Sequence, residues 1–245
     1  MRYTYLIIFF LFFNFFEGQT SGTLIYRITS EESKSNEENS QHMQGFFSFM
    51  NSLDRLRDSL FFNLDFNDKE SIFFLDKKKN IGISNEKGYN VILKSHGSSR
   101  YYRNDEERLL IEELNSDALY LIKSSVDSCK WQITKEMKKI NNYACFKAIA
   151  KVKSKSPMKG EHIKEVEAWY CPEIAINLGP LNYGGLPGLI VELKDRKFTY
   201  YLYSINLNSN PIIERPFKGK VVTKEQYYNM IPHITRENFN EYIGN

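Results

Sequence analysis

The sequence predicts a mainly β protein: a curved antiparallel sheet or partial barrel, with one packed amphipathic helix and a short C-terminal helix. Two observations lead to this fold class. Short segments with apolar residues at alternate positions recur along most of the chain, and turn residues separate them at short, fairly regular intervals. This spacing favours antiparallel hairpins over βαβ units. The chain of 245 residues also has a length typical of one domain.

The N-terminus predicts a cleavable secretory signal peptide over residues 1–18. One arginine near the start precedes an apolar run over 5–16 that is interrupted only once. This run has the length of a signal-peptide core and is short for a membrane span. We expect cleavage after Gly18, with cleavage one or two residues later and an uncleaved anchor left open as alternatives.

The mature chain, residues 19–245, is then expected to be a single β-rich domain, exported to the periplasm or secreted. No later apolar stretch has the length of a bilayer-spanning helix, so we expect no membrane span after signal cleavage. The formal net charge of +3 on a chain this long argues against a nucleic-acid partner.

The strand predictions begin at residues 22–28, where apolar and polar side chains alternate. Alternation on either side of turn residues at 67–69 predicts a hairpin over 60–75. Residues 103–114 leave a helix open, because the acidic residues at 105–107 suit a first turn, but we favour a strand there. The remaining strands are predicted at 89–94, 108–114, 118–123, 131–134, 144–152, 164–170, 189–193 and 198–205.

Two helices are predicted. After a polar loop over 29–41, a helix over 42–58 follows from apolar residues at helical spacing, namely Phe46, Phe47, Met50, Leu53 and Leu56. Its apolar stripe is expected to face the sheet. The second helix, over 223–230, begins with Thr223 and has Gln226 three residues later, which is the pattern of a capping box.

The three cysteines are Cys129, Cys145 and Cys171. An odd number allows at most one pair within the chain, and no CxxC spacing indicates a zinc site or a thioredoxin-type redox pair. The four histidines are scattered, without metal-ligand spacing. We therefore predict no metal and no cofactor.

The predicted hairpins suggest which cysteines pair. If strands 144–152 and 164–170 form a hairpin about a turn at 156–160, Cys145 lies opposite residues near 170, and Cys171 comes within reach. Cys129 and Cys145 flank another hairpin, but its turn places Cys145 opposite residues near 138. We predict a Cys145–Cys171 disulfide, which depends on the separation of the two Cα atoms.

The most distinctive stretch is glycine-rich and leads into a predicted strand. Proline followed by glycine at 187–188 suits a type II turn over 186–189, because proline fixes φ and glycine accepts a positive φ. The stretch lacks the GK[ST] ending of a phosphate-binding P-loop, and a strand follows it where a dinucleotide fingerprint needs a helix. We interpret it as a structural turn, with these residues: Gly179, Pro180, Gly185, Leu186, Pro187, Gly188, Leu189 and Ile190.

With these residues the chain resembles the GLPGLI family, which is named for the string at 185–190. Further blocks follow the family order: Trp131, Lys139-Ile140, Tyr143 to Ala148, Ala168-Trp169-Tyr170 and Gly179-Pro180. The chain departs from the family at 141–142, where two asparagines replace a usual glycine, and in the lysine-rich loop at 152–163. The resemblance implies an exported protein of Gram-negative bacteria with a β-rich domain, and nothing catalytic.

Two interpretations are open for the aromatic residues Trp131, Trp169 and Tyr170. In the first they line a ligand pocket inside a curved sheet, and in the second they pack in the core, as aromatic residues on strands more often do. No GxSxG elbow is present, and Cys145 lies in an apolar strand context that suits packing or a disulfide better than nucleophilic attack.

The sequence therefore predicts a non-enzymatic exported protein that binds an unidentified ligand or a partner protein in the cell envelope. A periplasmic carrier of apolar cargo is one concrete form of this prediction. Two alternatives stay open: an envelope hydrolase or peptidase with a dispersed active site, and a structural subunit of a surface complex. Fold analogy alone does not choose among them.

Overall fold

The computed structural model describes residues 21–31, 44–83 and 88–234. The predicted signal peptide and most of the predicted loop over 29–41 lie outside these residues. Among the described residues, no helix is long and apolar enough to cross a membrane.

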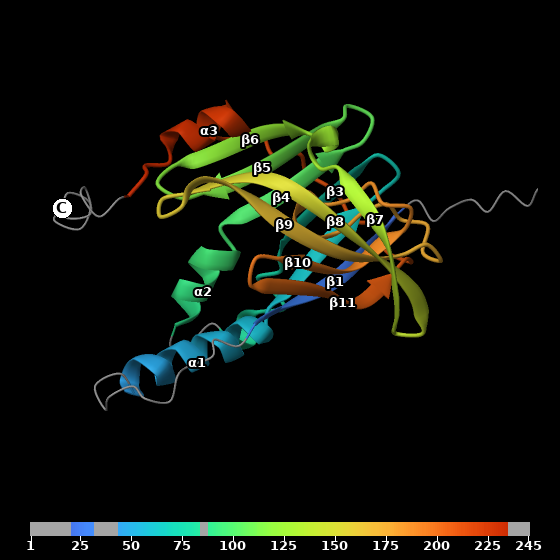
Figure 1. Cartoon of the computed structure of the whole chain (residues 1–245), viewed down its shortest axis with the longest axis horizontal. Coiled ribbons are helices and arrows are strands. Elements are labelled where there is room, and N and C mark those ends of the chain that lie inside the picture. Colours follow the sequence, from blue (N-terminus) through green and yellow to red (C-terminus); the bar gives the residue numbers. More distant parts are fainter. Residues whose placement is uncertain (1–20, 32–43, 84–87, 235–245) are drawn as a thin grey trace, which may run out of the picture.

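One large curved sheet dominates the fold, as the alternation of apolar residues predicts (Figure 1). Its strand order is β12-β6-β5-β4-β3-β2-β1-β11-β10-β9-β8-β7, and the sheet does not close into a barrel. All neighbouring strands are antiparallel except β12 and β6. The strands are β1 Gly22–Ser30, β2 Phe61–Phe66, β3 Glu70–Leu75, β4 Ser99–Asn104, β5 Leu109–Asn115, β6 Leu119–Ser125, β7 Trp131–Ile140, β8 Tyr143–Ser156, β9 Gly160–Cys171, β10 Leu189–Asp195, β11 Phe198–Asn206 and β12 Lys220–Thr223.

Within the described residues, three α-helices accompany the sheet: α1 (Gln44–Asp58) and α2 (Tyr89–His96) at one end, and α3 (Lys224–Met230) beside β6 (Figure 1). Leu53 and Leu56 of α1 are buried, as its predicted stripe requires. The predicted capping box of α3 is confirmed, because the backbone N–H of Gln226 donates to Thr223 Oγ1 at 3.1 Å and the backbone N–H of Thr223 donates to Gln226 Oε1 at 2.8 Å. The described part of the chain also contains the short 3₁₀ turns η2 (Ile81–Ile83), η3 (Val126–Ser128) and η4 (Pro180–Asn182).

The strand predicted at 89–94 is wrong, because this segment forms α2. Its apolar residues are contiguous, and only Ile92 among them is fully buried, while Val91 remains exposed. A short apolar run of this kind does not distinguish a strand from a buried turn of helix.

The structure excludes the helix that the sequence allowed over 103–114 as an alternative to a strand. Arg108 has a left-handed φ of 50° and ends a turn between β4 and β5, whose residues Tyr101 and Glu112 pair directly. Strands β4 and β12 escaped prediction, because β4 is rich in charged and polar residues and β12 has only four residues.

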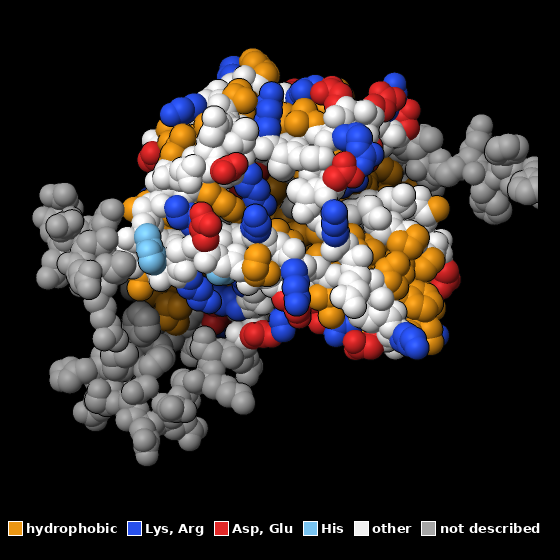
Figure 2. Space-filling model, turned by 45° about the horizontal axis from the view of Figure 1, so that its top comes forward, with side chains coloured by type: hydrophobic (Ala, Val, Ile, Leu, Met, Phe, Trp, Pro, Cys, Tyr) orange, Lys and Arg blue, Asp and Glu red, His pale blue; other side chains and the backbone are white. Residues whose placement is uncertain are grey.

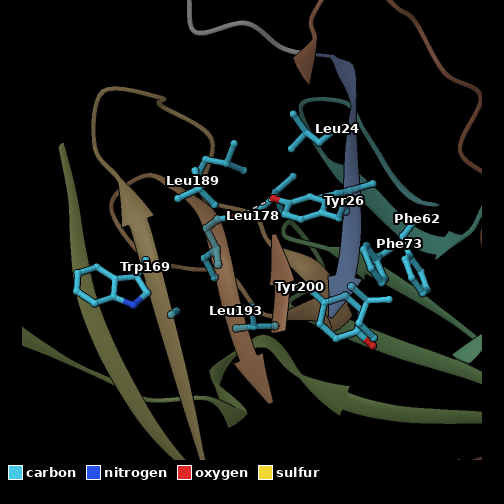
Figure 3. Close-up of a cluster of buried hydrophobic side chains, with 14 of the residues drawn as sticks. Leu24, Tyr26, Phe62, Phe73, Trp169, Leu178, Leu189, Leu193 and Tyr200 are labelled. Atoms are coloured by element: carbon cyan, nitrogen blue, oxygen red, sulfur yellow. Dashed lines mark hydrogen bonds between the residues drawn. The ribbon is translucent and has the colours of Figure 1, made fainter. Parts of the chain in front are cut away.

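The main core lies where β1 passes between β2 and β11 (Figure 3). The rings of Phe62 and Phe73 stack with centroids 5.3 Å apart, and Tyr200 meets both edge-on. Tyr26 is completely buried, and its hydroxyl donates to the carbonyl oxygen of Ile190 at 2.7 Å. This bond satisfies a polar group that would otherwise be costly to bury, and it ties β1 to β10 across β11.

Candidate functional site

The curvature of the sheet leaves a cavity of about 330 Å³ between strands β4–β6 on one side and β8–β11 on the other. Helix α3 and the loop before β10 contribute further walls. Figure 2 shows a hollow on one face of the molecule, with Lys and Arg side chains around it and hydrophobic side chains deeper inside. We call this space the concave cavity.

The first wall carries a carboxylate in an inward position. Tyr101, Glu112 and Ile122 are neighbours across β4, β5 and β6, so their side chains share the face that lines the cavity. The Ser99 hydroxyl donates to Glu112 Oε1 at 3.3 Å. Burial raises the pKa of Glu112, and the charge of Lys224 partly offsets this rise.

The opposite wall carries a buried ion pair. Asp195 at the end of β10 is 5% exposed, and its Oδ2 binds Lys164 Nζ from β9. Its other oxygen, Oδ1, is buried and accepts no hydrogen bond from any described residue. The Nε atom of Arg196 lies 3.5 Å from this Oδ1 atom. Asp195 therefore lines the cavity with a carboxylate whose Oδ2 is bound to Lys164 and whose Oδ1 is buried.

Helix α3 brings a second amine to the cavity. It runs on from β12, which pairs with β6, and the Tyr228 hydroxyl donates to the Lys153 carbonyl of β8 at 3.1 Å. Lys224 in its first turn lines the cavity, and burial lowers its pKa. Within the described residues, neither Lys224 nor Glu112 has an ion pair closer than 4.0 Å, although each shifts the pKa of the other.

Aromatic rings form much of the remaining lining. Burial raises the pKa of Tyr101, Tyr183 and Tyr200, so their hydroxyls stay neutral at pH 7 and can both donate and accept hydrogen bonds. Phe73 and Phe198 add purely apolar surface. The lining therefore combines rings, hydroxyls and fixed charges, which is typical of small-molecule sites.

The nucleophile candidates in the cavity are poorly activated. Burial raises the pKa of Cys129 to about 11, so its thiol remains protonated at neutral pH. Burial and nearby cations lower the pKa of His96 to about 4, and its Nε2 already accepts a hydrogen bond from Arg57 at 3.1 Å. The described residues also contain no cluster of three or more His, Cys, Asp or Glu that could hold a metal ion. The arrangement suits binding better than nucleophilic catalysis.

Replacing Glu112 with glutamine is expected to stabilise the protein at neutral pH. A carboxyl whose folded pKa is raised costs stability once it ionises, so this cost grows as pH rises from the ordinary glutamate range through the raised pKa. The glutamine variant avoids the cost. Its advantage should appear as a higher midpoint of urea unfolding at pH 7 and should vanish in acid.

Glu113→Gln is the matched control, because Glu113 points to the other face of β5 and lies 3.6 Å from Arg100. It should not gain stability at pH 7. Equal midpoints for wild type and Glu112→Gln at every pH would contradict the assigned environment of Glu112.

The glycine-rich stretch forms the wall between the two sides of the cavity. The chain leaves β9 at Cys171, loops over 172–188 and returns to pair Leu189 with Cys171. At the loop tip, the Asn182 amide donates to the Tyr102 carbonyl of β4 at 3.1 Å, and Tyr183 lines the cavity. The loop therefore connects β9 and β10 to β4.

The predicted type II turn needs a correction. Gly188 has a positive φ of 144°, as expected, but its N–H donates to the Leu186 carbonyl at 2.8 Å. The Leu189 N–H donates to the Ile174 carbonyl at 3.1 Å, so it does not close the turn over 186–189. Because the Leu189 N–H is bound to Ile174 near the start of the loop, it cannot close a hydrogen-bonded type II turn with Leu186.

The three predicted pocket aromatics do not come together. Trp131 donates from Nε1 to the Gly184 carbonyl at 3.0 Å and packs edge-on against Tyr183, so it supports the cavity wall from behind. Trp169 is 8% exposed and belongs to the cluster of buried hydrophobic side chains (Figure 3), with Lys138 Nζ 4.2 Å from its ring centroid. Tyr170 is buried in the main core. None of the three is among the residues that line the concave cavity.

Sequence reasoning missed the charged residues of the cavity. One signal was available: in β5, an acid at 112 occupies the same face as two leucines at 110 and 114, where the alternation predicts an inward side chain. Lys164, Asp195 and Lys224 carry no comparable local signal, because their convergence depends on the curvature of the whole sheet.

The predicted partners Cys145 and Cys171 lie opposite each other on β8 and β9, as the neighbouring pair Phe146 and Tyr170 shows. Both are buried thiols, and their Sγ atoms are 3.1 Å apart. We propose that they form a disulfide in an oxidising compartment, which would add about 3 kcal/mol of stability by constraining the unfolded chain. Cys129 lies elsewhere, at the cavity wall.

Mass spectrometry of peptides cleaved without reduction should reveal a Cys145–Cys171 link. Cys129 should become alkylated once the protein is unfolded without reductant. A crosslink that contains Cys129, or three alkylated cysteines in protein isolated from an oxidising compartment, would contradict the proposed pairing.

Comparison with known proteins gives a partial family match. A family model described as a protein of unknown function (Porph_ging), a family found in Bacteroidetes, matches residues 153–192. This range runs from β8 through the glycine-rich loop into β10, and it covers less than half of the chain. The resemblance to the GLPGLI family stays a prediction. No curated protein matches the chain.

Solved structures show similarity in fold. PNGF-II in space group P21 matches with a TM-score of 0.50 and 14% identity over 86% of this chain. PNGF-II in space group C2 gives a TM-score of 0.45 and 14% identity over 92%. The Mycobacterium tuberculosis lipoprotein LppX gives 0.27 and 9% identity over 79% of this chain and 88% of its own. The chain spans 33% of each PNGF-II chain, and identities this low indicate fold alone.

Proposed function

We propose that this protein is exported to the envelope of a Gram-negative bacterium and binds a small ligand in the concave cavity without transforming it. The apolar run near the N-terminus supports export, and the partial match to a family found in Bacteroidetes supports the source. The support for ligand binding comes from the residues that line the concave cavity.

The observation that carries the proposal is the pair of opposite charges that share the cavity without touching. Glu112 and Lys224 are both half-buried, and burial disfavours the charged form of each. A fold selected for stability alone would pair them or replace them with apolar residues. Uncompensated ionisable groups in a cavity are typical of functional sites.

The size and lining of the cavity also fit a small ligand. Its volume of about 330 Å³ lies near the lower end of the range of roughly 300–1,000 Å³ that ligand pockets occupy. Six charged side chains line the cavity: Glu112, Lys155, Lys164, Asp195, Arg196 and Lys224. They disfavour the purely apolar cargo predicted from the sequence, because such cargo would leave Glu112 and Lys224 without water or a charged partner.

Native mass spectrometry of the mature protein, purified gently from the envelope fraction of its own cells, tests the proposal. We expect a small, reproducible added mass on the wild type. Lys224→Met should lose this mass, because it removes the cavity amine while keeping an unbranched side chain. Lys220→Met is the matched control, since Lys220 is an exposed lysine on β12 just before α3, and it should keep the mass.

Two other outcomes would overturn the proposal. A stoichiometric protein bound in place of a small molecule would favour the structural-subunit alternative. A chain without any added mass, from wild type and control alike, would redirect the search to the hydrolase alternative.

A further inference from the structure

Two carboxylates, Glu112 and Asp195, line the concave cavity. Glu112 has acceptor capacity left for a ligand, because the Ser99 hydroxyl provides only one hydrogen bond to it, whereas Asp195 is bound to Lys164 and its Oδ1 is buried. The negative charges of Glu112 and Asp195 each raise the pKa of the Tyr101 hydroxyl, so both carboxylates face the same part of the cavity. A primary ammonium has three donors and a positive charge, so it can satisfy such acceptors.

The cavity also contains an amine without an anion. Lys224 has no ion pair within 4.0 Å among the described residues, whereas Lys164 on the facing wall is already bound to Asp195. Glu112 lies too far from Lys224 to form an ion pair with it. A carboxylate on a ligand would give Lys224 this missing partner. A charge-assisted bond of this kind is stronger than one between neutral groups.

Ligands of a single charge fit the cavity poorly. An anion placed at Lys224 would leave Glu112 without a charged partner, and a cation placed at Glu112 would leave Lys224 without one. Each unpaired buried charge carries a large desolvation penalty. A ligand with one positive and one negative end satisfies both residues at once, and it bridges the gap that separates them.

The neutral part of the lining indicates what lies between the two ends. Tyr101, Tyr200 and Phe198 provide ring surface for an apolar or aromatic side chain, and Ser124 adds a hydroxyl to the lining that can bind a peptide amide. The volume of about 330 Å³ admits a compact molecule and excludes an extended peptide.

We infer that the ligand of the concave cavity is a zwitterion that carries a primary ammonium and a carboxylate, in the class of free amino acids and dipeptides. The ammonium binds Glu112, and the carboxylate binds Lys224. This inference rests on the proposed function and adds the chemical class of the ligand to it.

The test uses the full mature protein and a set of Xaa-Ala dipeptides and free amino acids that covers each standard side chain. Calorimetric titration identifies the compound that binds most tightly, and its N-acetyl and C-amide derivatives are then compared with it. We expect each derivative to bind at least about tenfold more weakly, because each loses a hydrogen-bonded charge.

Two variants assign the ends of the ligand. In Glu112→Gln, the free amine and its N-acetyl derivative should bind with nearly equal affinity. In Lys224→Met, the free acid and its amide should do so. Glu113→Gln and Lys220→Met are the controls, and both should retain the full discrimination of the wild type.

The failures of the two proposals are distinguishable. If no dipeptide or amino acid binds, or if the doubly blocked derivative binds as tightly as the free compound, the zwitterion inference is overturned. The proposed binding function still stands in that case if the mass bound to protein from its own cells is lost in Lys224→Met. If that mass is absent as well, both proposals fail.

Discussion

Replacing Gly188 with alanine is expected to prevent stable folding, with a loss of more than about 4 kcal/mol in the free energy of unfolding. A Cβ at this position would lie 2.1 Å from the Cys171 carbonyl oxygen and 2.8 Å from Pro172 Cα. These are backbone atoms, so no rotamer change relieves the clash. The φ of 144° is itself a conformation that suits glycine.

Gly185→Ala is the control within the same motif. Gly185 also has a positive φ, of 80°, but a Cβ there would meet nothing within 4 Å. Its cost should be limited to the backbone conformation, about 1 kcal/mol. Urea unfolding followed by circular dichroism measures both variants, and equal losses would contradict the close approach of Gly188 to the end of β9.

Removing the carboxylate in Asp195→Ala is expected to cost about 3–5 kcal/mol, because the variant leaves the Lys164 ammonium without its buried partner. The two side chains are 7% and 17% exposed. Asp127→Ala is the matched control, since Asp127 pairs with Arg108 at the surface and both are 61% exposed.

The surface variant should lose less than about 1 kcal/mol. Thermal and urea unfolding at pH 7 compare the two variants directly. Similar losses would mean that the Lys164–Asp195 pair is solvated, which would contradict its burial in the cavity wall.

The sheet could be predicted because each strand with one buried face shows alternation within its own sequence. The wrong strand at 89–94 has a run of adjacent apolar residues, and such a run fits either element until its neighbours are known. Strand β4 was not predicted, because its sequence shows no alternation of apolar and polar residues. Its two tyrosines are adjacent and lie between arginines, one of which, Arg103, is buried.

The site could be predicted only in part. The glycine-rich loop stands out because its backbone needs glycine, and this loop does form one wall of the cavity. Glu112 and Lys224 lie far apart in the sequence, on β5 and α3, and their proximity follows from the way β12 adds to the edge of the sheet beside β6. Parallel pairing of a four-residue strand leaves no trace in local periodicity.

The position of β1 in the sheet affects how the chain folds. Its two neighbours are β2, which follows soon after it in the sequence, and β11, which pairs Thr23 with Asn206. The hairpins of β2 to β6 and of β7 to β9 contain mostly local contacts and can form early, whereas the seam between β1 and β11 must close a loop that includes nearly the whole domain. Such long-range pairing is slow, so a newly made chain exposes the apolar face of β1 until its last strands are available. A chain of this topology depends on protection from aggregation during that interval, and C-terminal truncations that remove β11 should accumulate as aggregates.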